Sequence, residues 1–403
     1  MKALRFAARS LVRQPARAAL GVLGVAAVGA LLLDMLMLSN GLVVSMRDLL
    51  DRYGWDIRVA GGDLPLQGPR IRHASTTADT IANLPSVRAA LLFRIADARI
   101  DRPNVGPLTA QLVGVEVRSA PGRGVVRTSP PWTIVSGRDI GSAAGDVVIN
   151  QPLASASHIA PGSILTMRVS CVAEREALPP TTLHVTGLAE FPFSGVNEYV
   201  VGGTLGTLKT ACGGNVVDEV DLLLVTSTGD ADGAAAAIRA AGLGVNAMTN
   251  DEVVGRFQQA GFSYFRQISS VLTAVTVSFA VLLITVLLTV SVNQRLGEIA
   301  ALRALGLSRS RVVKDVLSES VLIVGTGGLL SLPLGWLLAA GLDNILKAMP
   351  GVPAELHFFV LEREALAVHL ALLVLTALLA AAYPMRIVST LPIAATLRDE
   401  VIG

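Results

Sequence analysis

The stretch QISSVLTAVTVSFAVLLITVLLTVSVNQ, residues Gln267 to Gln294, decides the fold class because it contains no charged residue. A helix needs about 20 predominantly apolar residues to cross a bilayer. Lipid offers the backbone no hydrogen-bond partners, and a helix satisfies its own. The stretch therefore predicts a membrane-spanning helix.

Three further stretches have the same character. Asp34 is the only charged residue between Arg17 and Arg47, and the stretches from Ser320 to Leu342 and from Ala365 to Met385 contain none. We predict four transmembrane helices, at 18–46, 266–294, 317–343 and 364–386. Buried helices of a large soluble protein are the alternative, but four such stretches with charged flanks would be unusual for them.

The composition agrees with a membrane protein. Of the 403 residues, 52% are hydrophobic and 16% are charged, whereas soluble domains carry about a quarter charged residues. A uniformly soluble enzyme and a disordered chain are disfavoured, and two cysteines exclude a disulfide scaffold. A net charge of +2 gives no reason to expect a nucleic-acid partner.

Basic residues predict the orientation, because cytoplasmic flanks of transmembrane helices are enriched in Lys and Arg. They cluster before the first predicted helix and after the second, at Lys2, Arg5, Arg9, Arg13, Arg17, Arg295, Arg303, Arg309, Arg311 and Lys314. We expect a cytoplasmic loop at 295–316, an outer loop at 344–363 and a cytoplasmic tail at 387–403. Both termini are then cytoplasmic.

The first 17 residues carry arginines at every fourth position. This spacing is typical of an amphipathic helix on the inner membrane surface, with its arginines toward anionic head groups. The alternative is that the arginines only set topology. A cleavable signal peptide is disfavoured, because the apolar stretch resumes after Asp34 and continues through Val44.

Residues 47–265 are long enough for an autonomous extracytoplasmic domain. Short β-rich runs alternate with helical pieces, which predicts an α+β domain, with Gly and Pro clusters suggesting two lobes. The expected strands are Trp55 to Ala60, Leu91 to Ile100, Thr109 to Val117, Asp146 to Asn150, Ser163 to Val169, Thr182 to Phe191 and Val220 to Thr226. Expected helices are Thr76 to Leu84, capped through Thr76 and Asp79, and the alanine-rich Asp232 to Ala241.

Cys171 and Cys212 both fall in this domain. In an oxidising compartment they could form one disulfide, which would contribute about 2–4 kcal/mol. Two buried free thiols are an equally good interpretation.

Motifs for catalysis or nucleotide binding are missing from the sequence. The five histidines show no H-x-x-x-H or H-E-x-x-H spacing, and there is no G-x-S-x-G. None of the four lysines stands in G-x-x-x-x-G-K-[ST]. We expect a non-catalytic chain that binds no cofactor or metal, although a triad assembled from distant residues would leave no such motif.

The cytoplasmic loop has the pattern of a helix, a turn and a second helix. Leu296, Ile299, Leu302 and Leu305 recur about every third residue. Gly306 is a natural helix end and Ser308 a natural start for the next helix. The remaining polar side chains of the loop would face a cytoplasmic partner. The alternative is a solvated loop whose arginines only enforce topology.

This loop, RLGEIAALRALGLS at 295–308, resembles the R-x-x-E-I-x-x-L-R-A-x-G-x-S segment of the FtsX-like permease family of ABC systems, which includes MacB-type efflux and lipoprotein-releasing permeases. The tail resembles that family's Y-P-A and P-x-x-A-L-R patterns through Tyr383, Pro384, Pro392, Leu397 and Arg398, with Met385 where Ala is usual and Thr396 as an extra polar residue. Residues Val135 to Asp139 resemble a G-R motif of the MacB-like outer domain.

The resemblance implies a permease subunit of the bacterial inner membrane, with ATP and Mg²⁺ bound by a separate ATPase. It implies a coupling helix that contacts the ATPase, built from Arg295, Leu296, Gly297, Glu298, Ile299, Leu302, Arg303, Leu305 and Gly306. Expected partners are two ATPase copies, a second permease copy or sister permease, a periplasmic adaptor or lipoprotein, and membrane lipid. The substrate would be a lipid, a lipoprotein or a hydrophobic compound. A signalling module that activates an extracytoplasmic cell-wall hydrolase is the alternative function.

Several small or polar residues stand inside the predicted helices. Ser331, Gly335 and Ala339 recur every fourth residue, which predicts close packing against another helix of the same chain. Ala26 and Ala30 have the same spacing and suggest a dimer face. Asp34 is expected to face protein, water or a substrate route.

Overall fold

The computed structural model describes residues 15–63, 65–66, 68–102, 106–120, 130–141, 145–171, 179–214, 218–259, 263–294, 296–297, 300, 308–349 and 352–390. The chain divides into two compact units. A helical unit takes Met1–Leu42, Ser263–Asn344 and His357–Gly403, and a second unit takes Val43–Phe262 with Ile345–Leu356. We call the second unit the inserted domain.

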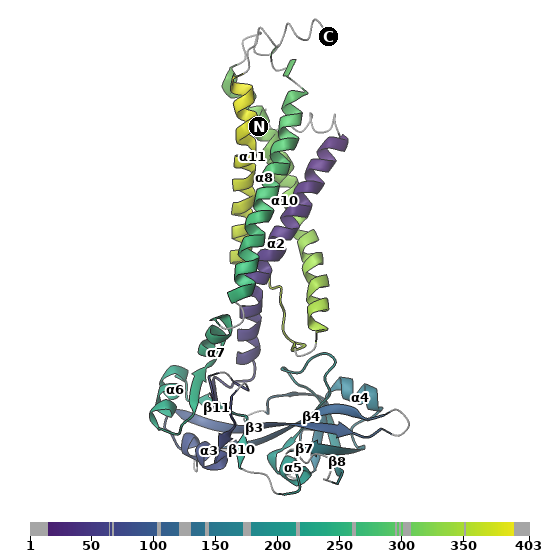
Figure 1. The fold of residues 1–403 in the computed structure, drawn as a ribbon, viewed down its shortest axis with the longest axis vertical. Coiled ribbons are helices and arrows are strands. Elements are labelled where there is room, and N and C mark those ends of the chain that lie inside the picture. The colour runs from purple at the N-terminus through teal and green to yellow at the C-terminus, as the bar shows by residue number, and fades with distance from the viewer. Residues whose placement is uncertain are drawn as a thin grey trace. The chain divides into compact units, whose positions relative to one another are not determined.

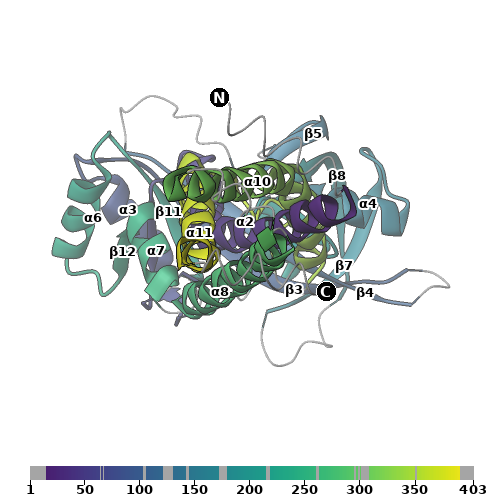
Figure 2. The ribbon, with the colours of Figure 1, turned by 90° about the horizontal axis from the view of Figure 1, so that it is seen from above.

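The helical unit is built from α2 (Pro15–Asp51), α8 (Ser263–Asn293), α10 (Arg309–Lys347) and α11 (Arg363–Thr390). Within the described residues, these four helices are long and apolar enough to cross a membrane. Figure 2 views them nearly along their lengths. The predicted fold class, four apolar helices with a large domain of helices and strands between the first and second, is confirmed.

The helices extend beyond the expected spans, most of all α10, which covers Arg309–Lys347 where 317–343 was expected. α2 continues to Asp51, five residues past the expected boundary at 46. Leu49 and Leu50 explain the extension, because both are buried and the sequence offers neither Gly nor Pro to end the helix earlier. The last turns of α2 thus belong to the inserted domain.

The inserted domain is organised by one large sheet with the strand order β12-β1-β11-β3-β4-β9-β6-β8-β5. Its strands are β1 (Ile57–Ala60), β3 (Val87–Ile100), β4 (Leu108–Arg118), β5 (Thr133–Gly137), β6 (Asp146–Ile149), β7 (Ile164–Ser170), β8 (Thr181–Glu190), β9 (Val200–Thr204), β11 (Leu222–Ser227) and β12 (Asn246–Thr249), and β2 (Ile71–Arg72) pairs separately with β10 (Glu219–Val220). Its helices are α3 (Ala74–Ala82), α4 (Gln151–Ser157), α5 (Leu205–Ala211), α6 (Ala231–Ala240) and α7 (Asn250–Phe257). The long strands β3 and β4 run through the middle of the domain (Figure 1).

One end of the sheet closes on itself. β7 pairs with both β3 and β8, so the strands β3, β4, β9, β6, β8 and β7 form a closed circuit. The interior of this circuit is filled by aliphatic side chains such as Leu112, Ile149, Leu165 and Val201, each at most 1% exposed. A closed circuit leaves fewer free strand edges, and its interior is packed with side chains.

At the other end the sheet is covered on both faces. Alternate residues of β11 point to opposite sides, so Leu223 and Val225 pack with α3 and α6, whereas Leu222 and Leu224 pack with α7 and the end of α2. The face toward α7 also holds Trp55 and Trp132. This face lines an apolar hollow of the domain.

Two sequence expectations for this domain need correction. The expected cap of the first helix at Thr76 and Asp79 is wrong: α3 begins at Ala74, and the carboxylate of Asp218 accepts from the backbone and hydroxyl of Ser75 instead. Strand β9 is absent from the expected strands, because the glycines in its sequence VVGGT argue against a strand. The structure needs one of them, since a Cβ on Gly202 would lie 2.9 Å from Phe191.

Candidate functional site

Most of the expected coupling helix lies outside the described residues. This applies to Arg295, Glu298, Ile299, Leu302, Arg303, Leu305 and Gly306. Leu296 and Gly297 are described as helical and half-buried, and α10 begins at Arg309, directly after Ser308. In the tail, Pro384 lies within α11, whereas Pro392, Leu397 and Arg398 are outside the described residues.

Small residues of α10 form the contact with α2. A Cβ on Gly327 would lie 2.6 Å from the Cβ of Val25, and one on Gly335 would lie 3.1 Å from a methyl group of Leu33. Ser331 lies between these two glycines in the sequence, and a Cβ on Gly29 of α2 would lie 2.8 Å from the Cβ of Ser331. The predicted role of these residues in packing within one chain is confirmed.

The same contact overturns the suggested dimer face. Ala26 and Ala30 are buried inside the chain, at 3% and 0% exposure, and the carbonyl oxygen of Ala30 faces Gly335. Large apolar side chains that remain exposed are instead found on the outer faces of all four helices, for example Leu20, Leu282, Trp336 and Leu378. Lipid or a second copy would cover those faces.

Polar side chains within the helical unit bond between helices. The hydroxyl of Ser331 donates to the carbonyl oxygen of Gly328 at 2.7 Å and lies 3.1 Å from Nε2 of His369 on α11. Since the single hydroxyl proton is already used, Nε2 of His369 must donate to Ser331. His369 is thus a packing residue held by a hydrogen bond. Asp34 is 1% exposed, and its Oδ1 has no hydrogen-bond partner among the described residues.

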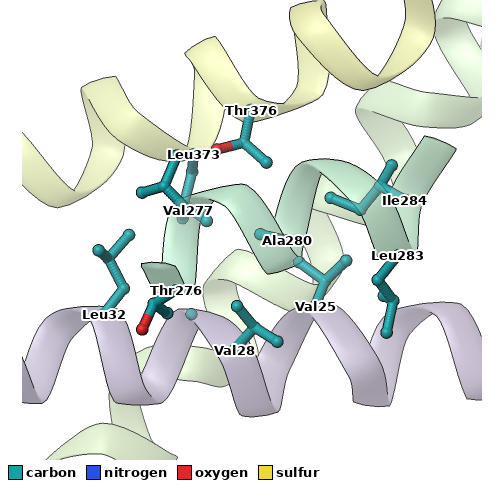
Figure 3. Close-up of a pocket in the computed structure, with 11 residues that line it drawn as sticks. Val25, Val28, Leu32, Thr276, Val277, Ala280, Leu283, Ile284, Leu373 and Thr376 are labelled. Atoms are coloured by element: carbon teal, nitrogen blue, oxygen red, sulfur yellow. The ribbon is translucent and has the colours of Figure 1, made fainter. Parts of the chain in front are cut away.

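The centre of the helical unit is closed. A cavity of only about 10 Å³ lies between α2, α8 and α11 (Figure 3). It is lined by Val25, Val28, Gly29, Leu32, Thr276, Val277, Ala280, Leu283, Ile284, Leu373 and Thr376. A single water molecule needs about 10–15 Å³ of such volume. A transported molecule therefore has no room between α2, α8 and α11 in this conformation.

A buried arginine joins the end of α2 to the inserted domain. Arg58 on β1 donates to the carbonyl oxygen of Leu50 at 3.4 Å and to the side-chain oxygen of Asn250. Asn250 in turn donates to Asp51 at 2.6 Å. Burial lowers the pKa of Arg58 to about 10, and the nearby Asp51 and Asp56 partly offset this. The sequence analysis missed this cluster, although a single arginine inside the apolar strand IRVA is its visible signal.

The outer loop contributes to the inserted domain through its end. Glu355 forms an ion pair with Arg52 at 2.7 Å, and the backbone N–H of Ala354 donates to Ser194 at 2.9 Å. Burial and the neighbouring Glu355 raise the pKa of Glu190. The loop between α10 and α11 is thus bonded to the inserted domain.

The two cysteines are bridged in the structure. Cys171 follows β7 and Cys212 ends α5, and their Cα atoms are 5.8 Å apart. Both side chains adjoin the packed interior of the closed circuit of strands. The bridge ties α5 to the strand that closes the circuit.

Two hollows lie in the inserted domain. One, of about 440 Å³, is lined mainly by apolar side chains of β3, β4, β11, α7 and the end of α2. The other, of about 460 Å³, lies over the ends of β3 and β4 and is lined by polar and apolar residues. These hollows also had no sequence signal, because their lining comes from distant segments of the chain.

The comparisons with known proteins identify the helical unit. Residues 270–393 match the FtsX-like permease C-terminal domain. The chain therefore contains an FtsX-like permease C-terminal domain. The matched segment runs from within α8 to just beyond α11, so it includes the loop at 295–308 and, of the tail residues that carry the resemblance, Tyr383, Pro384 and Pro392.

Two solved structures resemble part of the permease. One is the extracellular domain of the ABC-type transporter YknZ from Gram-positive bacteria, at 13% identity, 48% coverage of this chain, 98% of that chain and a TM-score of 0.32. The other is the periplasmic region of MacB from Actinobacillus actinomycetemcomitans, at 11% identity, 52% and 95% coverage and a TM-score of 0.35. These TM-scores are low, so the family assignment rests on residues 270–393. No curated protein matches the permease.

Proposed function

We propose that this permease is the membrane subunit of an ABC transporter, in which a separate ATPase drives a conformational change of the inserted domain. The family match over 270–393 carries the proposal. The 403-residue sequence also has no phosphate-binding G-x-x-x-x-G-K-[ST] motif. ATP and Mg²⁺ are then bound by two partner ATPase copies, and a second copy of this chain or a sister permease completes the complex.

The proposed orientation puts both termini and the 295–316 loop in the cytoplasm of a bacterium and the inserted domain outside the inner membrane. The distribution of basic residues supports it. The Cys171–Cys212 bridge also supports it, because disulfides persist in oxidising compartments.

The proposed path of force begins at the loop and ends at Arg58. The ATPase moves the helix at Leu296 to Leu305, α8 and α2 carry the displacement along their lengths, and the cluster around Arg58 transfers it to β1. The hydrogen bond from Arg58 to the carbonyl of Leu50 supports the last step, because it joins the end of α2 directly to β1 of the large sheet.

The coupling step is tested with Gly306→Val and Glu298→Lys in a complex purified with its ATPase. We expect both variants to reduce stimulated ATP hydrolysis to about the rate of the ATPase alone and to abolish transport. A β-branched side chain in place of Gly306 would hinder a sharp turn, and a lysine in place of Glu298 would reverse a charge at the ATPase surface. Glu364→Lys at the start of α11 is the matched control for charge reversal. Unchanged hydrolysis and transport in both loop variants would remove the assignment of this loop.

We further propose a lipid, a lipoprotein or a hydrophobic compound as the substrate. The 440 Å³ hollow supports an apolar substrate, because its lining is mainly aliphatic and aromatic. Purification of the complex from its native membrane separates the possibilities. A bound lipoprotein indicates extraction and an adaptor indicates efflux, whereas a cell-wall hydrolase without a substrate indicates signalling.

A further inference from the structure

The two hollows of the inserted domain adjoin. Gln111 and Glu198 line both of them, so the apolar hollow opens toward the polar one along the same strands. Together they offer about 440 and 460 Å³, within the range of about 300–1,000 Å³ typical of small-molecule sites.

The pairing register of β3 and β4 shows where the apolar hollow gives way to the polar one. On the sheet face that lines both hollows, Phe93 pairs with Val115, Ile95 with Val113, and Asp97 with Gln111. Successive pairs on one face lie two residues apart along each strand. The face therefore changes from apolar to polar within one step, between Ile95 and Asp97.

The apolar hollow is lined by large apolar side chains from several segments. Leu222 and Leu224 of β11 form part of its floor, and Phe191, Val253 and Phe257 form part of its wall. Arg58 also reaches it, but the guanidinium is engaged by Leu50 and Asn250. A hydrocarbon chain or a ring system would gain burial here without displacing a charge.

The polar hollow has an unbalanced charge. Its ionisable side chains are Asp97, Glu198 and Arg102. Arg102 already donates to the carbonyl oxygens of Gly106 and Ala156, at 3.3 and 3.1 Å. Asp97 is exposed to the hollow, and its carboxylate has no hydrogen-bond or ion-pair partner among the described residues. Arg99 follows on the same face but does not line the hollow.

We propose that the joined hollows bind one amphiphile, with its apolar body against Leu222 and Leu224 and a cationic head group beside Asp97. The charge of the polar hollow selects an ammonium over a carboxylate. The inference rests on the proposed function only in naming this amphiphile as the transported compound, because binding itself requires neither ATP nor the ATPase.

Energy transfer from tryptophan provides the test. The chain has three tryptophans, of which Trp55 and Trp132 lie in the apolar cluster beneath the hollow and Trp336 lies in α10. In a Trp336→Phe background, the remaining donors therefore report on the inserted domain. The probes are two long alkyl chains carrying a dansyl group, one ending in trimethylammonium and the other in carboxylate. The full chain is placed in phosphatidylcholine nanodiscs, and the signal of empty nanodiscs is subtracted.

We expect saturable energy transfer with the ammonium probe and weaker binding of the carboxylate probe. Asp97→Asn should lower the affinity for the ammonium probe about three- to fivefold, which is the effect expected from losing one partly exposed ion pair. Asp101→Asn is the matched control, because Asp101 lies just beyond the same strand and outside the hollow. Val113→Phe should weaken both probes by filling the apolar hollow.

Three outcomes would overturn the inference. Absence of saturable transfer removes the site, as does unchanged binding in Val113→Phe. Equal affinity for both probes, or no effect of Asp97→Asn, would contradict the binding of a cationic head group beside Asp97. These results are independent of the Gly306 and Glu298 experiment, which tests the proposed function. Binding without ATP-driven movement of the probe would leave the site standing and remove its role in transport.

Discussion

Arg58 shows how much one residue contributes to this molecule. Its guanidinium binds the last turn of α2 and the first residue of α7, two segments almost 200 positions apart in the sequence. A buried guanidinium loses hydration that only several acceptors can replace. The bonds to Leu50, Trp55 and Asn250 supply those acceptors.

We predict that Arg58→Met destabilises the inserted domain by about 2–4 kcal/mol, because Asn250 and the carbonyl of Leu50 lose a buried partner. The measurement is denaturant unfolding followed by tryptophan fluorescence. Arg88→Met is the control, since Arg88 is an exposed arginine on β3. Equal stability of the two variants would show that the cluster holds α2 without Arg58.

Among the elements, the contact between α2 and α10 depends on glycines, because their lack of a side chain lets the two helices approach closely. At Gly327 the space for a side chain is taken by Val25 and the carbonyl of Val22. Apolar surface alone does not drive helices together in lipid, so close approach and dispersion must do so. Gly325, two residues away and on another face of the helix, does not matter in this way, because a Cβ there would meet nothing within 4 Å.

We predict that Gly327→Leu lowers the stability of the permease in detergent by about 1–3 kcal/mol, as expected for overpacking. Gly325→Leu on the same helix should have little effect, and both changes alter helix propensity equally. Thermal unfolding of the two purified variants checks this. A loss of similar size in Gly325→Leu would mean that the backbone change, and not the α2 contact, is responsible.

At the scale of the whole molecule, a helical unit and an inserted domain are stabilised by different forces. The inserted domain buries aliphatic side chains from water, as a soluble domain does, and adds one covalent bridge between Cys171 and Cys212. The helical unit leaves large apolar side chains exposed along its outer faces. These apolar faces are stable only when lipid or another chain covers them, whereas the inserted domain is stable in contact with water.

We predict that reduction of the Cys171–Cys212 bridge lowers the stability of the inserted domain by about 2–4 kcal/mol, because the bridge joins residues 41 positions apart and so constrains the unfolded chain. Unfolding with and without reductant measures the effect. The double variant Cys171→Ser with Cys212→Ser is the control and should not respond to reductant. A wild-type midpoint that is insensitive to reductant would contradict the prediction.

The four helices could be predicted because a long apolar segment that crosses a bilayer must satisfy its own backbone hydrogen bonds, and a helix does so. The packing role of Gly335 and Ser331 was also visible in their spacing, and so was the family, from the loop at 295–308. Strand β9 could not be predicted, because its two glycines argue against a strand and the side chains that crowd Gly202, Phe191 and Trp132, come from other segments of the chain. The cap of α3 was missed since its acceptor, Asp218, lies far away in the sequence.

The sequence by itself determined where the chain can cross a membrane and which family its segment 270–393 resembles, because hydropathy and a local motif depend on neighbouring residues alone. The tertiary structure decided that Ala26 and Ala30 face inward, that the last turn of α2 is hydrogen-bonded to Arg58, and that Asp97 lines a polar hollow beside an apolar one. Each of these brings together residues from distant segments, and burial and charge complementarity exist only once the chain has folded.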